Sequence, residues 1–147
     1  DVYKRQVLQH VITHGYSNYD AVMILQPTSP LRKYHHINNS IDLFNNDPNA
    51  DSLVSVTKVP HNYTPEKLMS LNGKYLIGNN TIKRRQDVAE YYARNGAAIY
   101  ITKKELLKDN IMGNSIIPFF MEKIESIDID DTDDWMIVEA LMKHCDK

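Results

Sequence analysis

The sequence lacks three features that would each point to a particular class of protein. Its 147 residues include a single cysteine, Cys145, so no internal disulfide can form and a reducing compartment is permitted. No apolar run approaches the roughly eighteen residues of a membrane span, and the first residues form no apolar signal core. The formal net charge of −2 provides no basic field for nucleic acid. These absences favour a cytoplasmic protein whose partners are small molecules or other subunits, with no nucleic acid and no membrane.

The remaining composition is that of an ordinary globular protein. Apolar residues make up 42% of the chain and charged residues 24%, which excludes the disordered class. A chain of this length suffices for one hydrophobic core and is short for two. We therefore expect residues 1–147 to form a single domain.

Hydrophobic periodicity predicts an α/β fold. Apolar residues at helical spacing predict helices over 4–14, 37–44 and 135–142, and a capping box at 102–105 predicts the start of a short helix followed by a loop. Short apolar or alternating runs predict strands over 20–25, 51–57, 97–101 and 125–130. Asn72-Gly73 between residues 66–71 and 74–77 predicts a β-hairpin. Since strands and helices alternate elsewhere, we expect a mostly parallel sheet.

The stretch ILQPTSPLR, residues 24–32, ends a predicted strand abruptly. Pro27 and Pro30 have no amide hydrogen and a fixed φ, so neither a strand nor a helix can continue through them. Ligands of open α/β sheets bind beyond the carboxyl ends of strands, where this turn would lie. The polar side chains that the turn would hold there, and which we take as candidate binding residues, are Gln26, Thr28, Ser29 and Arg32.

The stretch SIDIDDTDDW, residues 126–135, concentrates acidic side chains. On an extended segment Asp128 and Asp130 point to one side, while the isoleucines beside them point to the other. Two neighbouring carboxylates repel unless a cation lies between them, and oxygen ligands suit Mg²⁺. These two residues are therefore candidate magnesium ligands. The later acidic residues of the stretch are explained by the dipole of the following helix.

An EF-hand is an alternative interpretation of the same stretch. Asp128, Asp130 and Glu139 fall at loop positions 1, 3 and 12 of that motif, but Asp133 stands where the sharp-turn glycine is required. We reject the EF-hand on this ground. The six histidines show no paired spacing typical of zinc ligands, and we assign them no role.

A third cluster is basic and consists of KRRQD at 83–87 followed by RNGA at 94–97. Guanidinium groups bind carboxylates in a bidentate manner, and a turn with glycine lets the backbone approach a ligand. Spacing alone nevertheless favours a solvated basic segment, because charge runs usually lie on the surface.

Together and in this order, LQPTSPLR, RRQD with NGAAIYI, and SIDIDDTDDW resemble the cytidylyltransferases that activate sialic acid and related nonulosonic acids. The resemblance covers nearly the whole chain from about Tyr19. It implies a Rossmann-like nucleotide-diphospho-sugar transferase fold and a homodimer made by a protruding arm, here residues 60–94. It further implies transfer of CMP from CTP to a nonulosonic acid with Mg²⁺ and release of pyrophosphate, for lipopolysaccharide or capsule biosynthesis.

The same resemblance assigns roles to individual residues. Gln26 and Ser29 would line the sugar pocket, and Asn95 would contact the sugar from its turn. Three residues of the arm would reach the acidic sugar, in part from the partner subunit: Lys67, Arg85 and Gln86. Asp128 and Asp130 would be the catalytic residues that bind Mg²⁺.

The chain departs from the family pattern in two places. It has five glycines and none forms the Gly-rich loop with lysine that cradles CTP, so we expect a C-terminal fragment of a longer enzyme, inactive alone, in which residues 1–6 need not be native. An extra alanine follows Gly96, which affects the orientation of Asn95. The alternative function is a non-catalytic dimerisation or sugar-binding module. Ile111 and Met112, where an aromatic wall is expected, favour a sugar other than plain sialic acid, such as legionaminic or pseudaminic acid.

Overall fold

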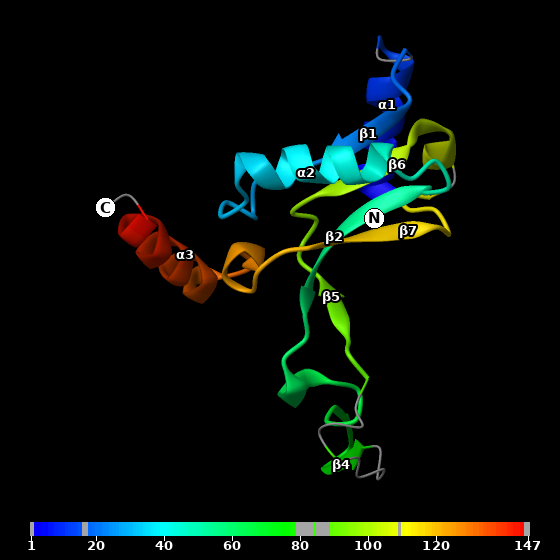
Figure 1. Ribbon diagram of the computed structural model, residues 1–147. Coiled ribbons are helices and arrows are strands. Elements are labelled where there is room, and N and C mark those ends of the chain that lie inside the picture. Colours follow the sequence, from blue (N-terminus) through cyan, green and yellow to red (C-terminus); the bar gives the residue numbers. More distant parts are fainter. Residues whose placement is uncertain (1, 16–17, 79–83, 85–88, 109, 146–147) are drawn as a thin grey trace.

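The chain folds into a mixed α/β structure (Figure 1). The computed structural model describes residues 2–15, 18–78, 84, 89–108 and 110–145. In chain order its helices, 3₁₀ helices (η) and strands are α1 (Val2–Thr13), β1 (Ala21–Ile24), α2 (Tyr34–Asn45), β2 (Ser52–Lys58), η1 (His61–Tyr63), β3 (Met69–Asn72), β4 (Tyr75–Gly78), β5 (Tyr92–Arg94), β6 (Tyr100–Lys103), η3 (Lys104–Lys108), β7 (Ile116–Phe120), η4 (Ile124–Ser126) and α3 (Thr132–Cys145). Within these residues, every helix is too short or too polar to traverse a lipid bilayer.

Strand β2 is the centre of a five-stranded sheet. The first half of β2 pairs antiparallel with β6 and the second half antiparallel with β5, while β7 pairs with β2 in parallel. Strand β1 pairs antiparallel with β6, which gives the order β1-β6-β2-β5 with β7 joined to β2. The predicted mostly parallel sheet was therefore wrong. The reason is that β6 lies between β1 and β2 and runs against both.

The hydrophobic core lies against this sheet. Leu53 on β2 and Ile99 before β6 are fully buried, and α2 contributes Phe44. The cluster consists of Phe44, Ala50, Leu53, Ala98, Ile99, Ile101, Phe119 and Met121. Two of these residues, Ala98 and Ile99, lie in the loop between β5 and β6, so packing of the core holds this part of the candidate site in place.

Most predicted elements are confirmed, with two exceptions near the C-terminus. The predicted helices over 4–14, 37–44 and 135–142 correspond to α1, α2 and α3, and the first two predicted strands to β1 and β2. The third predicted strand is shifted, since β6 begins at Tyr100. The predicted strand over 125–130 was wrong: η4 occupies its beginning and no strand is assigned to residues 127–130.

A strand forms instead over 116–120, where the sequence had indicated a loop. This strand, β7, contains Pro118, and proline normally argues against a strand because it cannot donate to the ladder. Within the described residues β7 pairs only with β2, so it is an edge strand, the position in which proline is tolerated.

The predicted hairpin forms as β3 and β4, which project away from the sheet (Figure 1). Asn72 pairs with Tyr75, so the two turn residues are Gly73 and Lys74 rather than Asn72 and Gly73. Gly73 has φ of +61°, as the first central residue of a type II′ turn requires. Both strands are exposed along almost their whole length.

Candidate functional site

Three segments that are distant in sequence, together with Lys4 of α1, line an open cavity of about 460 Å³. One segment follows β1, the second joins β5 to β6, and the third leads from η4 to α3. The lining residues are Lys4, Gln26, Thr28, Arg94, Gly96, Ala97, Tyr100, Asp128 and Asp130. The cavity therefore lies at the end of β1, where the proline turn was expected to place a site.

The proline turn after β1 is held by its own arginine. Arg32 Nη1 donates to the carbonyl oxygens of Gln26 at 3.1 Å and of Ala98 at 2.7 Å. The backbone N–H of Gln26 also donates to the backbone carbonyl oxygen of Ala97, at 3.3 Å. Arg32 thus ties the turn to the second segment, and its guanidinium binds backbone rather than facing the cavity.

The second segment is a large bulge opposite β2. Val56 pairs with Arg94 and Val54 with Tyr100, so the single residue Ser55 faces the five residues 95–99. The Ser55 hydroxyl donates to Asn95 Oδ1 at 2.6 Å and accepts from the Ile99 N–H at 2.8 Å. The ladder is interrupted here, and the buried Ser55 hydroxyl supplies the hydrogen bonds that the Ile99 N–H and the Asn95 side chain would otherwise lack.

The bulge contains a tight turn in which both central residues have positive φ. The Ala98 N–H donates to the Asn95 carbonyl oxygen at 3.1 Å, and φ is +66° at Gly96 and +63° at Ala97, as in a type I′ turn. A Cβ atom at position 96 would overlap the Asp128 carboxylate. Glycine is therefore required at 96 for close approach as well as for backbone conformation.

The acidic segment is hydrogen-bonded to the proline turn, and Asp128 also lies against Gly96 of the second segment. Ser29 Oγ donates to Asp128 Oδ1 at 3.1 Å, and the Ile129 N–H donates to the Thr28 carbonyl oxygen at 2.8 Å. Asp128 and Asp130 line the cavity, while Ile129 between them lines an apolar groove beside Trp135 of α3. The alternation expected of an extended segment is present even though the segment belongs to no strand.

The acidic residues that follow satisfy the start of α3. Asp131 Oδ1 accepts from the N–H groups of Asp133 at 2.9 Å and Asp134 at 3.0 Å. Asp134 Oδ2 accepts from the Asp130 N–H at 3.1 Å. The two bonds to Asp131 give free amides at the beginning of the helix an acceptor, which agrees with a helix-terminus role for this residue.

The predicted site residues that the structure describes lie in different places. Gln26, Thr28, Asp128 and Asp130 line the cavity, whereas Ser29 and Asn95 are buried beneath its wall. Asn95 Nδ2 donates to Ser126 Oγ at 3.0 Å, so both ends of its amide are bonded inside the protein. Lys67 is exposed in the arm and does not line the cavity. Arg85 and Gln86 lie outside the described residues.

Three polar residues that line the cavity were not among the candidate site residues: Lys4, Tyr100 and Arg94, the last of which belongs to the basic cluster at 94–97. Arg94 and Tyr100 are the last residue of β5 and the first of β6, so they flank the bulge on its two sides. Burial raises the pKa of Tyr100, and Arg94 partly offsets this shift. Tyr100 therefore presents a neutral hydroxyl at neutral pH. The feature of the sequence that could have identified Arg94 and Tyr100 is their position beside the glycine turn.

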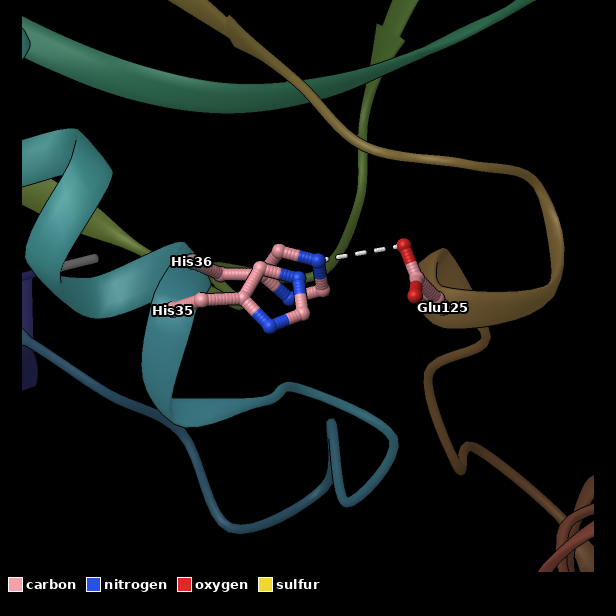
Figure 2. Close-up of side chains that lie close together, drawn as sticks. All are labelled: His35, His36 and Glu125. Atoms are coloured by element: carbon pink, nitrogen blue, oxygen red, sulfur yellow. Dashed lines mark ion pairs between the residues drawn. The ribbon is translucent and has the colours of Figure 1, made fainter. Parts of the chain in front are cut away.

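A second polar cluster lies outside the cavity, between α2 and η4 (Figure 2). Glu125 accepts from Lys33 Nζ at 2.7 Å and lies 3.1 Å from Nε2 of the buried His36. Nδ1 of His36 accepts from the Lys33 N–H at 3.1 Å, so the ring hydrogen is on Nε2 and is donated to Glu125. We call Lys33, His36 and Glu125 the Glu125 clamp. Hydrogen bonding to Lys33 lowers the pKa of Glu125, which keeps it ionised at neutral pH.

Substitutions at Gly96 and Ala97, the two central residues of the tight turn in the bulge, should have opposite effects. Gly96→Ala should destabilise the fold by at least about 2 kcal/mol, because the added methyl displaces Asp128 and the φ is unfavourable. Ala97→Gly removes an unfavourable left-handed alanine and should stabilise by up to about 1 kcal/mol. Urea unfolding of both variants measures this. Equal destabilisation by the two substitutions would contradict the described turn.

The buried histidine should make stability depend on pH. Burial lowers the pKa of His36 below 6.5, although Glu125 partly opposes the shift. A group with a depressed folded-state pKa stabilises the fold above its unfolded pKa, and this contribution is lost as the pH falls through the folded pKa. The free energy of unfolding should therefore fall from about pH 7 to about pH 5, and fall less in His36→Gln. Chemical unfolding at several pH values tests this, and identical slopes in the two proteins would refute it.

Comparison with known proteins relates the chain to one group of enzymes. No protein-family model matches it. It is 30% identical over 135 residues to the CMP-N,N'-diacetyllegionaminic acid synthase of Legionella pneumophila, a match covering 85% of the chain and 55% of that protein. It is 31% identical over 129 residues to the N-acylneuraminate cytidylyltransferase of Streptococcus agalactiae serotype III, covering 84% of the chain and 30% of that protein. The chain thus spans between about a third and about half of these curated relatives.

The fold also has a solved counterpart. CMP:2-keto-3-deoxy-manno-octonic acid synthetase, solved in complex with CTP, superposes with a TM-score of 0.66 at 15% identity, covering 95% of the chain and 68% of that protein. At this identity the match shows the fold alone. The sequence matches and the fold agree with each other: over about 85% of its length the chain is similar in sequence to the acylneuraminate and legionaminic acid cytidylyltransferases.

Proposed function

We propose that the protein containing this chain transfers CMP from CTP to a nonulosonic acid and releases pyrophosphate. The observation that carries the proposal is that Asp128 and Asp130 line the same cavity as Gln26 and Thr28 of the proline turn. The names of the relatives and the fold of the CTP-bound neighbour support the same reaction class. The product would serve lipopolysaccharide or capsule synthesis, and the enzyme would act in the cytoplasm.

The cavity offers a donor set that fits Mg²⁺. Asp128 and Asp130 supply carboxylate oxygens, the ligand type that this ion prefers, and the cavity leaves room for water and phosphate oxygens beside them. Ser29 donates to only one oxygen of Asp128, so the carboxylate retains further acceptor capacity. When bound, a divalent ion would neutralise charge on the triphosphate.

The reaction that fits the site is an attack by the anomeric hydroxyl oxygen of the sugar acid on the α-phosphorus of CTP. A new O–P bond forms, the bond from the α-phosphorus to the bridging oxygen of pyrophosphate breaks, and the hydroxyl proton is released to solvent overall. Such transfers depend mainly on positioning and charge neutralisation. Gln26 and Thr28 would position the sugar, and Arg94 adds positive charge at the same wall.

The carboxylate of the sugar would require cationic side chains around it. Lys4 and Arg94 are the basic residues that line the described cavity, and the resemblance implies further cations from the arm. By similarity to the cytidylyltransferases, Lys67, Arg85 and Gln86 on the arm would bind the carboxylate, in part across a dimer interface. Lys67 is exposed on the arm and does not line the cavity of the same subunit. A residue placed in this way could instead reach the cavity of the partner subunit.

The arm carries the apolar surface that a dimer would cover. Met69, Leu71 and Leu76 lie on one face of the hairpin, as the pairing of Leu71 with Leu76 and the alternation along each strand require. They are exposed by 57%, 72% and 63%. A two-stranded hairpin with such a face is marginal in water unless it packs against something. We therefore propose that the arms of two subunits pack together in a homodimer.

Charge on this face should dissociate the dimer. We expect Leu71→Asp combined with Leu76→Asp to convert the dimer to a monomer, because two carboxylates would be buried without partners. Ser70→Asp, on the opposite face of the same hairpin, is the matched control and should remain dimeric. Sedimentation equilibrium distinguishes the two. A double variant that stays dimeric would place the interface elsewhere.

Loss of one acidic residue should abolish turnover. In the full-length protein we expect Asp130→Ala to lower kcat by at least about 100-fold, the scale for removing one preorganised charge-stabilising group. Asp133→Ala removes a carboxylate three residues away that does not line the cavity, and it should retain near-normal activity. Pyrophosphate release with CTP and a panel of nonulosonic acids measures both variants. Near-normal activity of Asp130→Ala would refute the metal assignment.

A further inference from the structure

The acidic segment runs antiparallel to the turn after β1 and the start of α2. Three contacts define one register, in which Glu125 is bonded to Lys33 and His36, Asp128 to Ser29, and Ile129 to Thr28. Within the described residues a single backbone hydrogen bond, from the Ile129 N–H to the Thr28 carbonyl oxygen, joins the two segments. The register therefore depends on side chains, because no regular ladder enforces it.

The register decides which side chains enter the cavity. Because neighbouring side chains on an extended segment point to opposite sides, a slip of one residue would replace Asp128 and Asp130 by Ile127 and Ile129. The Ser29 to Asp128 bond is part of the site itself. The Glu125 clamp is anchored outside the cavity, at the opposite end of the paired segments.

The clamp is built as a strong anchor. The side chains of His36 and Glu125 are only 7% and 14% exposed, so water screens their interaction poorly. Removing Glu125 would leave the buried Nε2–H of His36 without its acceptor, which is costly because that donor is shielded from water. Two of the three residues also fix the start of α2, because the His36 ring accepts from the Lys33 backbone.

We propose that Glu125, through Lys33 and His36, is a positioning residue that sets the register of the acidic segment and so directs Asp128 and Asp130 into the cavity. The expected effect of Glu125 on turnover rests on the proposed cytidylyltransferase function. The expected effect of Glu125 on the register does not depend on that function and can be measured separately.

A metal site is the competing interpretation of this cluster. One potential ligand atom from each of His35, His36 and Glu125 lies within 4.8 Å of the others (Figure 2). A metal-bound imidazole donates from its other ring nitrogen, whereas Nδ1 of His36 accepts from a backbone N–H. Lys33 already supplies a cation to Glu125 at 2.7 Å. Both observations favour a hydrogen-bonded clamp over a metal centre.

Hydrogen exchange of the Ile129 amide tests the clamp directly, because this N–H makes the one backbone bond between the segments. In the full-length protein, Glu125→Gln and His36→Ala should each speed this exchange by about tenfold, the factor for losing one bond to a charged group. His36→Gln keeps a side-chain N–H donor and should restore most of the protection. Glu139→Gln removes the acid of the exposed Lys143 pair and is the matched control, with exchange unchanged.

The catalytic consequence is measured on the same variants. Glu125→Gln should lower kcat by about tenfold while the KM for CTP changes by no more than about twofold, because ground-state contacts remain. Unchanged Ile129 exchange in Glu125→Gln would overturn the proposal. Saturable Zn²⁺ binding that is lost in both His35→Ala and His36→Ala would also overturn it, in favour of a metal centre. A wild-type protein that is inactive yet shows the expected exchange pattern would refute the proposed function and support the clamp.

Discussion

The candidate site depends on the close approach of one carboxylate to one turn of backbone. Asp128 lies so near to Gly96 that no side chain fits at position 96, and the same carboxylate accepts a hydrogen bond from Ser29. This contact holds the acidic segment, which belongs to no strand, against the loops that follow β1 and precede β6. The position of Asp130 follows from it, because residues two apart on an extended segment face the same side.

The interrupted sheet explains how the turn reaches the acidic segment. Since β5 and β6 both pair with β2, the chain between them must leave the ladder, and five residues project where one residue of β2 lies opposite. Ser55 supports the base of this projection and Arg32 ties it to the proline turn. The polar residues around the site therefore divide into two groups. Gln26, Thr28, the acidic pair, Lys4, Arg94 and Tyr100 line the cavity, while Ser29, Arg32, Ser55 and Asn95 hold its walls.

Much of the fold and the approximate location of the site could be predicted from sequence. Hydrophobic periodicity and turn residues sufficed to predict the helices, β1 and β2. The two prolines indicated where β1 ends. Pairing could not be predicted, because local pattern does not reveal that β6 lies between β1 and β2. Pro118 concealed β7, and the alternation of the acidic segment mimicked a strand although its partners are side chains. Asn95 was expected to face the ligand, but its burial depends on Ser55 and Ser126, whose proximity is tertiary.

Divalent ion binding by the acidic pair is the central claim, and paramagnetic broadening by Mn²⁺ tests it most directly. In the full-length protein, substoichiometric Mn²⁺ should broaden first the amide signals of Thr28, Gly96, Asp128 and Asp130, which surround the cavity. Competition by Mg²⁺ should restore them. Broadening that instead centres on His35 and Glu125, or spreads evenly along the acidic start of α3, would contradict the account.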